Sequence, residues 1–480
     1  MAARPEEPPG RSQSVRSSEE AGNDRGAKGR RKVESEQSMS SESQKRPAGV
    51  TASTPPKQAG EAPDPWWWVE RNVWTERMLT RLAQSGPTTN WFGLWDKVWA
   101  EGNLRSAYYA VWRNDGAPGV DGQTIAQFEA QHGEELDRLR EELRTGGYQP
   151  QATRRVWVPK PGTTEQRPLG IPAVRDRVVQ AALRHVLEPI FERDFAGRSY
   201  GFRPGRGCQQ AVERVEELLS GGRVWCVDAD LKSYFDTIPH DRLMTLVGQR
   251  IVDGKVLGLL RQYLKAGVMA ELKQWQPTGQ GTPQGAVISP LLANLYLNPL
   301  DHEVAGRGWE MVRYADDFIV LCRTQAEAET VLAYLRQWTT GAGLTLHPAK
   351  TRIVNALSEG FDFLGWTFRG GKKWPRKKSE QKLKDNLRPW TRRNQGQSLA
   401  TIIAEINPKL RGWRAYFATS IPTGLSGPDG WLRRRLRALL RKREKRPGYG
   451  LSKADSQRWP NRWFAARGLY SLEHGTCDYG

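Results

Sequence analysis

The sequence predicts an α+β fold, in which an antiparallel sheet carries acidic residues at its strand ends and a basic helical region follows. Residues 310–322 (EMVRYADDFIVLC) place short apolar runs on both sides of Asp316 and Asp317, which is the pattern of a β-hairpin with both acids at its tip. Residues 223–231 (RVWCVDADL) form a second apolar run that ends in acids, including Asp230. From residue 398 onward, apolar side chains recur at the spacing of an α-helix.

The acids at these strand ends suit a divalent metal. Mg²⁺ prefers carboxylate oxygens and takes further ligands from water and substrate phosphates. Asp316 and Asp317, joined by Asp230, are the donor set that a two-metal site for phosphoryl or nucleotidyl transfer requires. The alternatives are a merely polar hairpin tip and an Asp230 that caps the following helix. Asp228 faces the same side of its strand as Asp230, roughly 6–7 Å back, so we expect it to support the site.

Composition narrows the class of protein. The 480-residue chain has a net charge of +20, which favours a polyanionic partner, and its length suffices for about three domains. Its four cysteines show no zinc-binding spacing, and we expect them to be reduced. No apolar run reaches the roughly 18 residues of a membrane span, and no signal peptide is evident. We therefore expect a cytoplasmic protein that is associated with the nucleoid when engaged with DNA.

The N-terminal region divides into a tail and a helical part. Residues 1–63 are rich in Ser, Glu, Gly, Pro and Lys, and such a segment buries too little apolar surface to fold, so we expect a disordered tail. Trp91, Trp95 and Trp99 then recur at helical spacing, and we expect them in the core.

The C-terminal region is expected to contain several helices. Residues 398–417 have a helical pattern that we expect to break at Asn407, with Pro408 in the first turn of a second helix. Residues 424–430 are expected to form a loop, and residues 431–446 (WLRRRLRALLRKREKR) a basic amphipathic helix.

Further motifs accompany the acids. They are VWVPKPGTTEQRPLGIPAVRDRVVQAA (156–182), SYGFRPGRGCQQAV (199–212), DLKSYFD (230–236), QGTPQGAVISPLLANLYL (280–297), YADD (314–317), LTLHPAKTR (344–352) and FDFLGWTF (361–368). In this order they resemble the blocks of reverse transcriptases encoded by group II introns, and LRGWRAYF (410–417) resembles part of a maturase. The resemblance implies a right-hand polymerase. Its implied parts are an N-terminal extension and the start of the fingers (64–153), the fingers (154–222), a palm with the antiparallel sheet (223–368), and a helical thumb and maturase region (369–475).

The resemblance also implies the catalytic centre. Asp230, Asp316 and Asp317 match the catalytic positions of the family, and two Mg²⁺ ions are implied to bind these carboxylates and the backbone carbonyl of Leu231.

A second implied set of residues binds the incoming nucleotide. Lys160 and Arg167 match positions that bind the triphosphate, for which a charged amine and a guanidinium fork are suited. Phe235 matches a steric gate that excludes a ribose 2′-hydroxyl, and Gln284 a nucleotide contact. Lys350 is expected to assist the departure of pyrophosphate. Solvated surface charge is the alternative for the cations, and a core position is the alternative for Phe235.

The implied activity is RNA-directed DNA polymerisation by a protein that binds its own intron RNA, promotes splicing and copies the intron into DNA. The implied partners are intron RNA, an RNA template–DNA primer duplex, target DNA and dNTPs, with no membrane. We expect Arg198 and Arg203 along the template backbone, and the basic clusters 369–393 and 431–446 on duplex or intron RNA. The tryptophans that interleave with these clusters, half of which we expect to be core rather than stacked on bases, are Trp374, Trp390, Trp413 and Trp431.

Two other functions are compatible with parts of the pattern. One is a stand-alone reverse transcriptase of the retron, diversity-generating or antiphage-defence type, against which the maturase-like segment argues. The other is an RNA chaperone with an inactive polymerase fold, against which the intact set of three aspartates argues. We expect no C-terminal nuclease of the His-Asn-His type, because few residues follow position 472.

Overall fold

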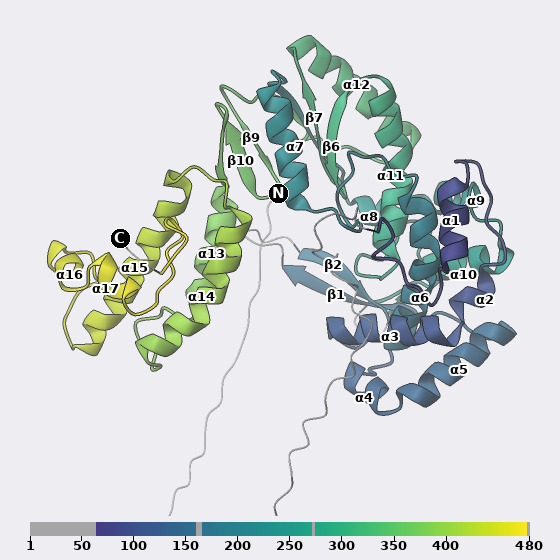
Figure 1. The fold of residues 1–480 in the computed structure, drawn as a ribbon, viewed down its shortest axis with the longest axis horizontal. Helices are drawn as coiled ribbons and strands as arrows, with labels where there is room; N and C mark the ends of the chain where they lie inside the picture. The colour runs from purple at the N-terminus through teal and green to yellow at the C-terminus, as the bar shows by residue number, and fades with distance from the viewer. Residues whose placement is uncertain (1–63, 160–165, 271–273, 478–480) are drawn as a thin grey trace, which may run out of the picture. The chain divides into compact units, whose positions relative to one another are not determined.

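The computed structural model describes residues 64–159, 166–270 and 274–477 (Figure 1). The tail predicted over residues 1–63 lies outside the described residues, as does Lys160, which is predicted to bind the nucleotide.

The first described part of the chain is helical. Its elements are α1 (Glu76–Gln84), α2 (Trp95–Val98), α3 (Glu101–Asn114), α4 (Ile125–Ala130) and α5 (His132–Thr145). Trp74 is fully buried, and its indole N–H donates to the carbonyl of His185 at 3.0 Å. Trp91 is buried, and Trp95 and Trp99 pack against the same core with part of their surface exposed. The prediction that these tryptophans belong to the core is confirmed.

A mixed sheet follows. It consists of β1 (Thr153–Pro159), β2 (Gln166–Ile171), β4 (Val268–Ala270) and β5 (Gln274–Gln276), in the order β2-β1-β4-β5. Strand β1 is antiparallel to β2 and parallel to β4. After β2 the chain enters α6 (Val174–Glu192), which is buried along most of its length. The helices α8 (Tyr234–Thr237), α9 (His240–Gly248) and α10 (Gly254–Lys265) precede β4. Helices therefore follow β2 and precede β4 in the chain, and they connect this sheet to the helical core.

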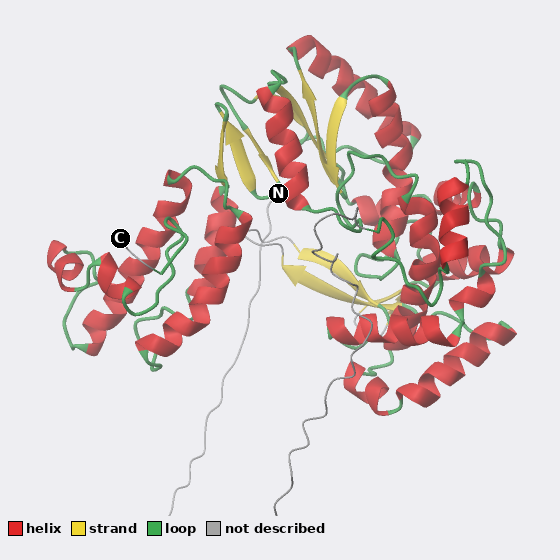
Figure 2. Cartoon of the chain, in the orientation of Figure 1, coloured by secondary structure: helices red, strands yellow, loops and turns green. Residues whose placement is uncertain are grey.

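The central sheet is antiparallel throughout, as the sequence predicts (Figure 2). It consists of β3 (Trp225–Asp230), β6 (Glu310–Tyr314), β7 (Asp317–Cys322) and β8 (Arg352–Asn355), in the order β6-β7-β3-β8. The helices that cover it are α7 (Cys208–Ser220), α11 (Ser289–Gly306) and α12 (Gln325–Gly341). Side chains of β7 alternate between the two faces: Phe318 and Val320 join the core beneath α11 and α12, whereas Ile319 and Leu321 join the core beneath α7. Both faces of the sheet are therefore largely buried.

A small third sheet leads into the C-terminal helices. Its strands are β9 (Phe361–Phe363), β10 (Trp366–Arg369) and β11 (Lys372–Pro375), all antiparallel. The helices are α13 (Lys377–Leu387), α14 (Leu399–Tyr416), α15 (Thr423–Arg443), α16 (Lys453–Arg458) and α17 (Asn461–Ala465). Leucine and isoleucine side chains of α13, α14 and α15 form one core with Phe464 of α17. The predicted helical C-terminal region is confirmed.

The predicted break at Asn407 is wrong, because α14 runs through Asn407 and Pro408 as one helix. Proline removes one backbone donor from a helix interior, but a tertiary contact holds the segment in place. The Asn407 side chain donates to the carbonyl of Gly468 at 2.7 Å and accepts from the N–H of Tyr470 at 3.0 Å.

The predicted loop over residues 424–430 is also wrong, because these residues form the first turns of α15. Asp429 explains the difference. Its buried carboxylate accepts from the hydroxyl of Ser471 at 2.7 Å and the N–H of Leu472 at 2.9 Å, and lies 3.0 Å from the guanidinium of Arg433. Gly424 permits close packing, since a Cβ at this position would lie 2.8 Å from the Cβ of Trp374. Within the described ranges, no helix has the length and apolar character needed to cross a bilayer.

Candidate active site

The central sheet brings the three predicted carboxylates to one edge. Asp230 is the last residue of β3 and Asp317 the first of β7, and the two are register partners in the antiparallel pair. Asp316 lies in the turn between β6 and β7. Asp228 lies further back on β3, where its carboxylate is 3.4 Å from the guanidinium of Arg352. Asp230, Asp316 and Asp317 therefore lie together at one end of the strands, a site called the carboxylate edge below. Asp228 already has a cationic partner.

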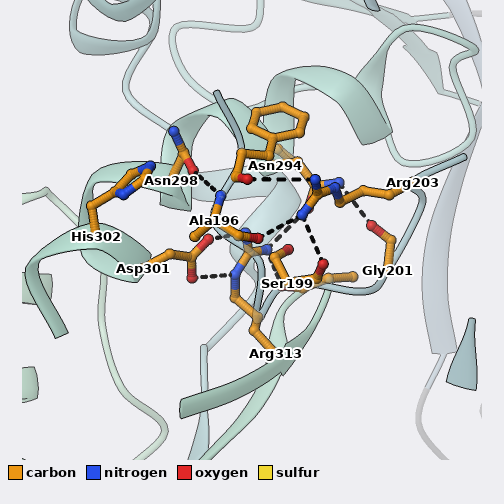
Figure 3. A network of polar contacts seen from close by, with 12 residues as sticks. Ala196, Ser199, Gly201, Arg203, Asn294, Asn298, Asp301, His302 and Arg313 are labelled. Atoms are coloured by element: carbon orange, nitrogen blue, oxygen red, sulfur yellow. Dashed lines mark hydrogen bonds and ion pairs between the residues drawn. The ribbon is translucent and has the colours of Figure 1, made fainter. Parts of the chain in front are cut away.

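A buried arginine holds the turn between β6 and β7 (Figure 3). Arg313 is fully buried, and it donates to the carbonyl of Ala315 at 2.9 Å and to the side chain of Asn294 at 3.0 Å. Its Nε donates to Asp301 at 2.7 Å. Ala315 has a φ of 60°, a left-handed conformation that disfavours residues other than glycine by roughly 1–2 kcal/mol. The hydrogen bond from Arg313 therefore stabilises the backbone that presents Asp316.

The charge of Arg313 is maintained by its buried partner. Burial alone lowers the pKa of the Arg313 guanidinium, but Asp301 more than offsets this effect, and the net pKa is raised. Sequence reasoning missed both residues. The available signal was Arg313 itself, a charged residue within the apolar run of β6. A charged residue in such a run predicts a buried partner of opposite charge.

The loop before α7 packs against the same turn. A Cβ at Gly201 would collide with the backbone nitrogen of Ala315, so only glycine allows this approach. The carbonyl of Gly201 accepts from the side chain of Asn294 at 2.8 Å, and the N–H of Tyr200 donates to the carbonyl of Arg313 at 2.8 Å. The SYGFRPGRG motif is therefore a backbone support for the carboxylate turn.

The prediction that Arg203 follows the template backbone is wrong. Its guanidinium is buried and donates to the carboxylate of Glu192 at 2.9 Å and to the carbonyls of Ala196 and Ser199 at 2.6 and 2.9 Å (Figure 3). Arg198 is likewise paired, at 2.7 Å from Glu310. Both arginines hold the protein's own backbone and side chains.

Burial and mutual repulsion characterise the carboxylate edge. Desolvation by the surrounding protein raises the pKa of the Asp317 carboxyl to about 7, although the residue as a whole is exposed at the start of β7, and the charges of Asp228 and Asp316 add to the effect. Burial also raises the pKa of Asp316, while the positive charge of Arg167 opposes it. Lys350 is the cation in direct contact, with its Nζ 3.0 Å from the carboxylate of Asp230. Crowded carboxylates of this kind favour binding of a cation.

The donor set fits Mg²⁺. Among the described residues, no three acidic, His or Cys side chains converge as a preformed metal cage. Mg²⁺ is usually held by one or two carboxylates together with substrate phosphates and water, rather than by an all-protein cage. The backbone on both sides of Leu231 is fixed, since the carbonyl of Asp230 accepts from His347 at 2.7 Å and the N–H of Lys232 donates to Thr345 at 2.9 Å.

The predicted nucleotide-binding residues come from three neighbouring segments. Arg167 is exposed on β2, opposite Val158 of β1. The carbonyl of Gln284 accepts from the N–H of Gly170 on β2 at 2.7 Å.

The segment that contains Gln284 also contacts α8. Phe235 of α8 is only 8% exposed, and its carbonyl accepts from the N–H of Thr282 at 2.7 Å. A cavity of about 260 Å³ is lined by residues that include Arg155, Asp236 and Gln284. Strand β2, the Gln284 loop and α8 are therefore contiguous beside the carboxylate edge.

Many basic residues of the C-terminal region are structural. Lys373 is buried, lies 2.5 Å from Glu216 and sits over the ring of Trp366. Arg437 is buried and donates to the carbonyl of Trp459 at 2.9 Å. The tryptophans Trp390, Trp413 and Trp431 pack partly buried against the C-terminal core. The exposed cations of the first cluster include Lys372, Lys377, Lys378, Lys382 and Arg392.

Comparison with known proteins agrees with the motifs. The family described as reverse transcriptase (RNA-dependent DNA polymerase) matches residues 158–368, and the group II intron maturase-specific domain matches residues 380–459. Protein YkfC of Escherichia coli (strain K12) is 38% identical over 288 residues, which cover 52% of this chain and 74% of YkfC. The group II intron-encoded protein LtrA of Lactococcus lactis subsp. cremoris is 40% identical over 197 residues, covering 41% of this chain and 32% of LtrA.

Among solved structures, a chain of a partial Cas6-RT-Cas1–Cas2 complex matches with a TM-score of 0.34 and 24% identity, covering 52% of this chain and 41% of that chain. The match to LtrA spans about a third of that protein's length. The two family matches lie in the order that the sequence motifs predict, with the carboxylate edge inside the first and α14 and α15 inside the second. The chain belongs to the group II intron-encoded proteins that combine a reverse transcriptase with a maturase-specific domain.

Proposed function

We propose that this protein binds its own intron RNA, promotes its splicing and copies it into DNA during intron mobility. The observation that carries the proposal is the union, in one chain, of the carboxylate edge and a maturase-specific domain. A stand-alone reverse transcriptase needs only the first of these.

In this proposal Asp230, Asp316 and Asp317 are the catalytic residues, and with the carbonyl of Leu231 they hold two Mg²⁺ ions. When bound, Mg²⁺ activates the primer 3′-hydroxyl and neutralises charge on the leaving pyrophosphate. The primer 3′-oxygen forms a bond to the α-phosphorus of the dNTP as the bond to pyrophosphate breaks. The Lys350 ammonium, beside Asp230 in the structure, moves to the departing pyrophosphate.

The nucleotide is held by the segments that flank the edge. Arg167, and Lys160 of the neighbouring segment, bind the triphosphate, for which guanidinium and ammonium groups are suited. Gln284 contacts the nucleotide from a loop that is fixed to β2. Phe235 excludes a ribose 2′-hydroxyl. This role rests on the small part of the ring that reaches the surface, since Phe235 is 8% exposed and the rest of it packs in the hydrophobic core.

The nucleic-acid partners are intron RNA, the RNA template–DNA primer duplex and target DNA. The exposed lysines of α13 and the segment before it provide phosphate contacts. The cell compartment follows from these partners: we place the protein in the cytoplasm and, during mobility, on the nucleoid.

A splicing assay tests the proposal. Precursor RNA that carries the intron flanking this reading frame is incubated with the wild type, with Asp316→Asn and with the control Asp241→Asn, which removes an exposed carboxylate on α9. All three proteins should accelerate splicing, and Asp316→Asn alone should fail to make cDNA. No acceleration by the wild type would favour the stand-alone reverse transcriptase.

A further inference from the structure

An exposed aromatic side chain stands beside the carboxylate turn. Phe202 is 48% exposed, and its ring centroid lies 6.4 Å from that of Tyr314, the residue before the turn. Phe202 belongs to the loop that leads into α7, in which the neighbouring Gly201 abuts the backbone of Ala315. A large apolar ring is thus held in water next to the reactive edge.

The backbone of Phe202 is strained. Its φ is 59°, a conformation that phenylalanine avoids because of its Cβ. Among the described residues, other non-glycine residues with positive φ include Ala315 in the turn and Ser233 after Asp230. Strained residues of this kind cluster at functional sites, where the surrounding structure over-determines them.

Both neighbours of Phe202 are fixed by buried groups, which explains how the strain persists. On one side, the carbonyl of Gly201 accepts from Asn294 at 2.8 Å. On the other side, the guanidinium of Arg203 binds the carbonyls of Ala196 and Ser199 (Figure 3). The loop therefore sets the position of Phe202.

The ring of Phe202 and the ammonium group of Lys350 lie beside different strands of the central sheet. In the sheet order β6-β7-β3-β8, Phe202 lies beside Tyr314 on β6, whereas Lys350 contacts Asp230 on β3. A phenyl ring has no donor for phosphate, but flat rings bind nucleotide bases by stacking. Lys350 therefore suits the triphosphate, and the uncharged ring of Phe202 suits the bases at the paired end of the duplex.

We infer that Phe202, together with Tyr314, forms an apolar platform that contacts the terminal nucleotides of the primer–template duplex. The inference rests on the proposed polymerase function of the carboxylate edge. It makes Phe202 a residue that positions nucleic acid and does not bind the dNTP phosphates.

The test uses the full chain with Phe202→Gly, Phe202→Ala and Phe202→Tyr. Glycine relieves the backbone strain, so the Tm of Phe202→Gly should be equal to or above that of the wild type. Its Kd for an RNA template–DNA primer duplex, measured by fluorescence anisotropy, should rise about tenfold, the loss of one aromatic–base contact. Phe202→Ala should raise the Kd for the duplex to the same extent without the gain in Tm, and Phe202→Tyr should bind the duplex as the wild type does. Phe92→Ala is the matched control, because Phe92 is 68% exposed in the segment before α2.

Three results would overturn the inference. A Kd of Phe202→Gly within twofold of the wild type would assign the ring no contact with the duplex. An increase in the KM for dNTP at unchanged duplex Kd would assign it to the nucleotide. A change only in the Kd for intron RNA would assign it to the maturase function. In each case primer extension by the wild type shows that the proposed polymerase activity itself stands, whereas a wild type without primer extension would remove the basis of both that activity and the inference.

Discussion

Aspartates at the carboxylate edge of the central sheet face other carboxylates, whereas aspartates in the C-terminal helices face arginines and hydrogen-bond donors. At the edge, Asp316 and Asp317 lie close to like charges, and burial raises the pKa of both carboxyls. In the C-terminal helices, Asp429 and Asp455 are buried against arginines and backbone donors. The partners of a carboxylate therefore distinguish a candidate cation site from a structural support.

Asp455 shows the structural case most clearly. Burial raises the pKa of its carboxyl, but hydrogen bonds from Ser452 and Arg441 outweigh burial, and the net pKa is lowered. The same carboxylate closes a capping box at the start of α16. Such a group is charged because the protein supplies its partners, whereas the Asp317 carboxyl lies near the like charges of Asp228, Asp230 and Asp316.

The largest effect on stability should come from the structural carboxylate of Asp429. Asp429→Ala removes the acceptor of Ser471 and Leu472 and the carboxylate that faces the buried Arg433. We expect the free energy of unfolding to fall by about 3–5 kcal/mol, as for other broken buried pairs. Urea denaturation followed by circular dichroism measures it. Glu405→Ala, an exposed carboxylate on α14, is the control. A loss below about 1 kcal/mol for Asp429→Ala would show that the pair does not hold α15.

A third kind of carboxylate environment sharpens the comparison, in which a buried carboxylate accepts from neutral donors. Asp176 accepts from the hydroxyl of Tyr148 at 2.6 Å and the N–H of Gln151 at 3.0 Å, and burial raises its pKa to about 6. The folded state therefore binds this proton more tightly than the unfolded state, whose aspartate pKa is about 4. Stability should fall by up to ~3 kcal/mol as the pH rises from about 4 to about 6, and this contribution should then stay constant.

Asp176→Asn tests this assignment, because asparagine does not titrate. The difference in unfolding free energy between wild type and variant should change across the range of about pH 4 to 6. Parallel curves for the two proteins would show that Asp176 does not titrate in this range.

The exposed lysines of α13 should give the smallest effect per residue. We expect a smaller salt dependence of intron RNA binding in three single variants, Lys377→Gln, Lys378→Gln and Lys382→Gln. In each, the magnitude of the slope of log K against log salt should fall by up to about 1, because fewer counterions are released on binding when one phosphate contact is lost. Filter binding over a salt series measures the slope. Lys265→Gln, an exposed lysine on α10, should leave it unchanged. Equal slopes for all variants would move the RNA site away from α13.

The sequence predicted the carboxylate edge because its signals are local. An apolar run that ends in acids predicts a strand end, and the alternation around Asp316 and Asp317 predicts the hairpin and the antiparallel sheet. The supporting pair of Arg313 and Asp301 was missed, because its members lie on different elements and meet only in the folded chain.

The C-terminal helices were predicted less well for the same physical reason. Pro408 and the glycines of residues 424–430 locally favour breaks, but Asn407 and Asp429 bind segments that follow much later in the chain. Arg203 illustrates the converse case, in which an apparent nucleic-acid contact is buried. Whether a charged side chain faces solvent or the chain itself depends on tertiary structure, which the motif alone does not contain.

The central claim is that the carboxylate edge performs nucleotidyl transfer, and that the binding of intron RNA does not depend on these carboxylates. The most direct test is the rate of single-nucleotide extension of a DNA primer on an RNA template by Asp317→Asn, measured beside its affinity for intron RNA. Asparagine preserves the shape of the side chain but removes its charge, so we expect the rate to fall by about 10³-fold or more while the Kd for RNA stays within twofold of the wild type. Extension within tenfold of the wild-type rate, by a variant that binds RNA normally, would contradict the account.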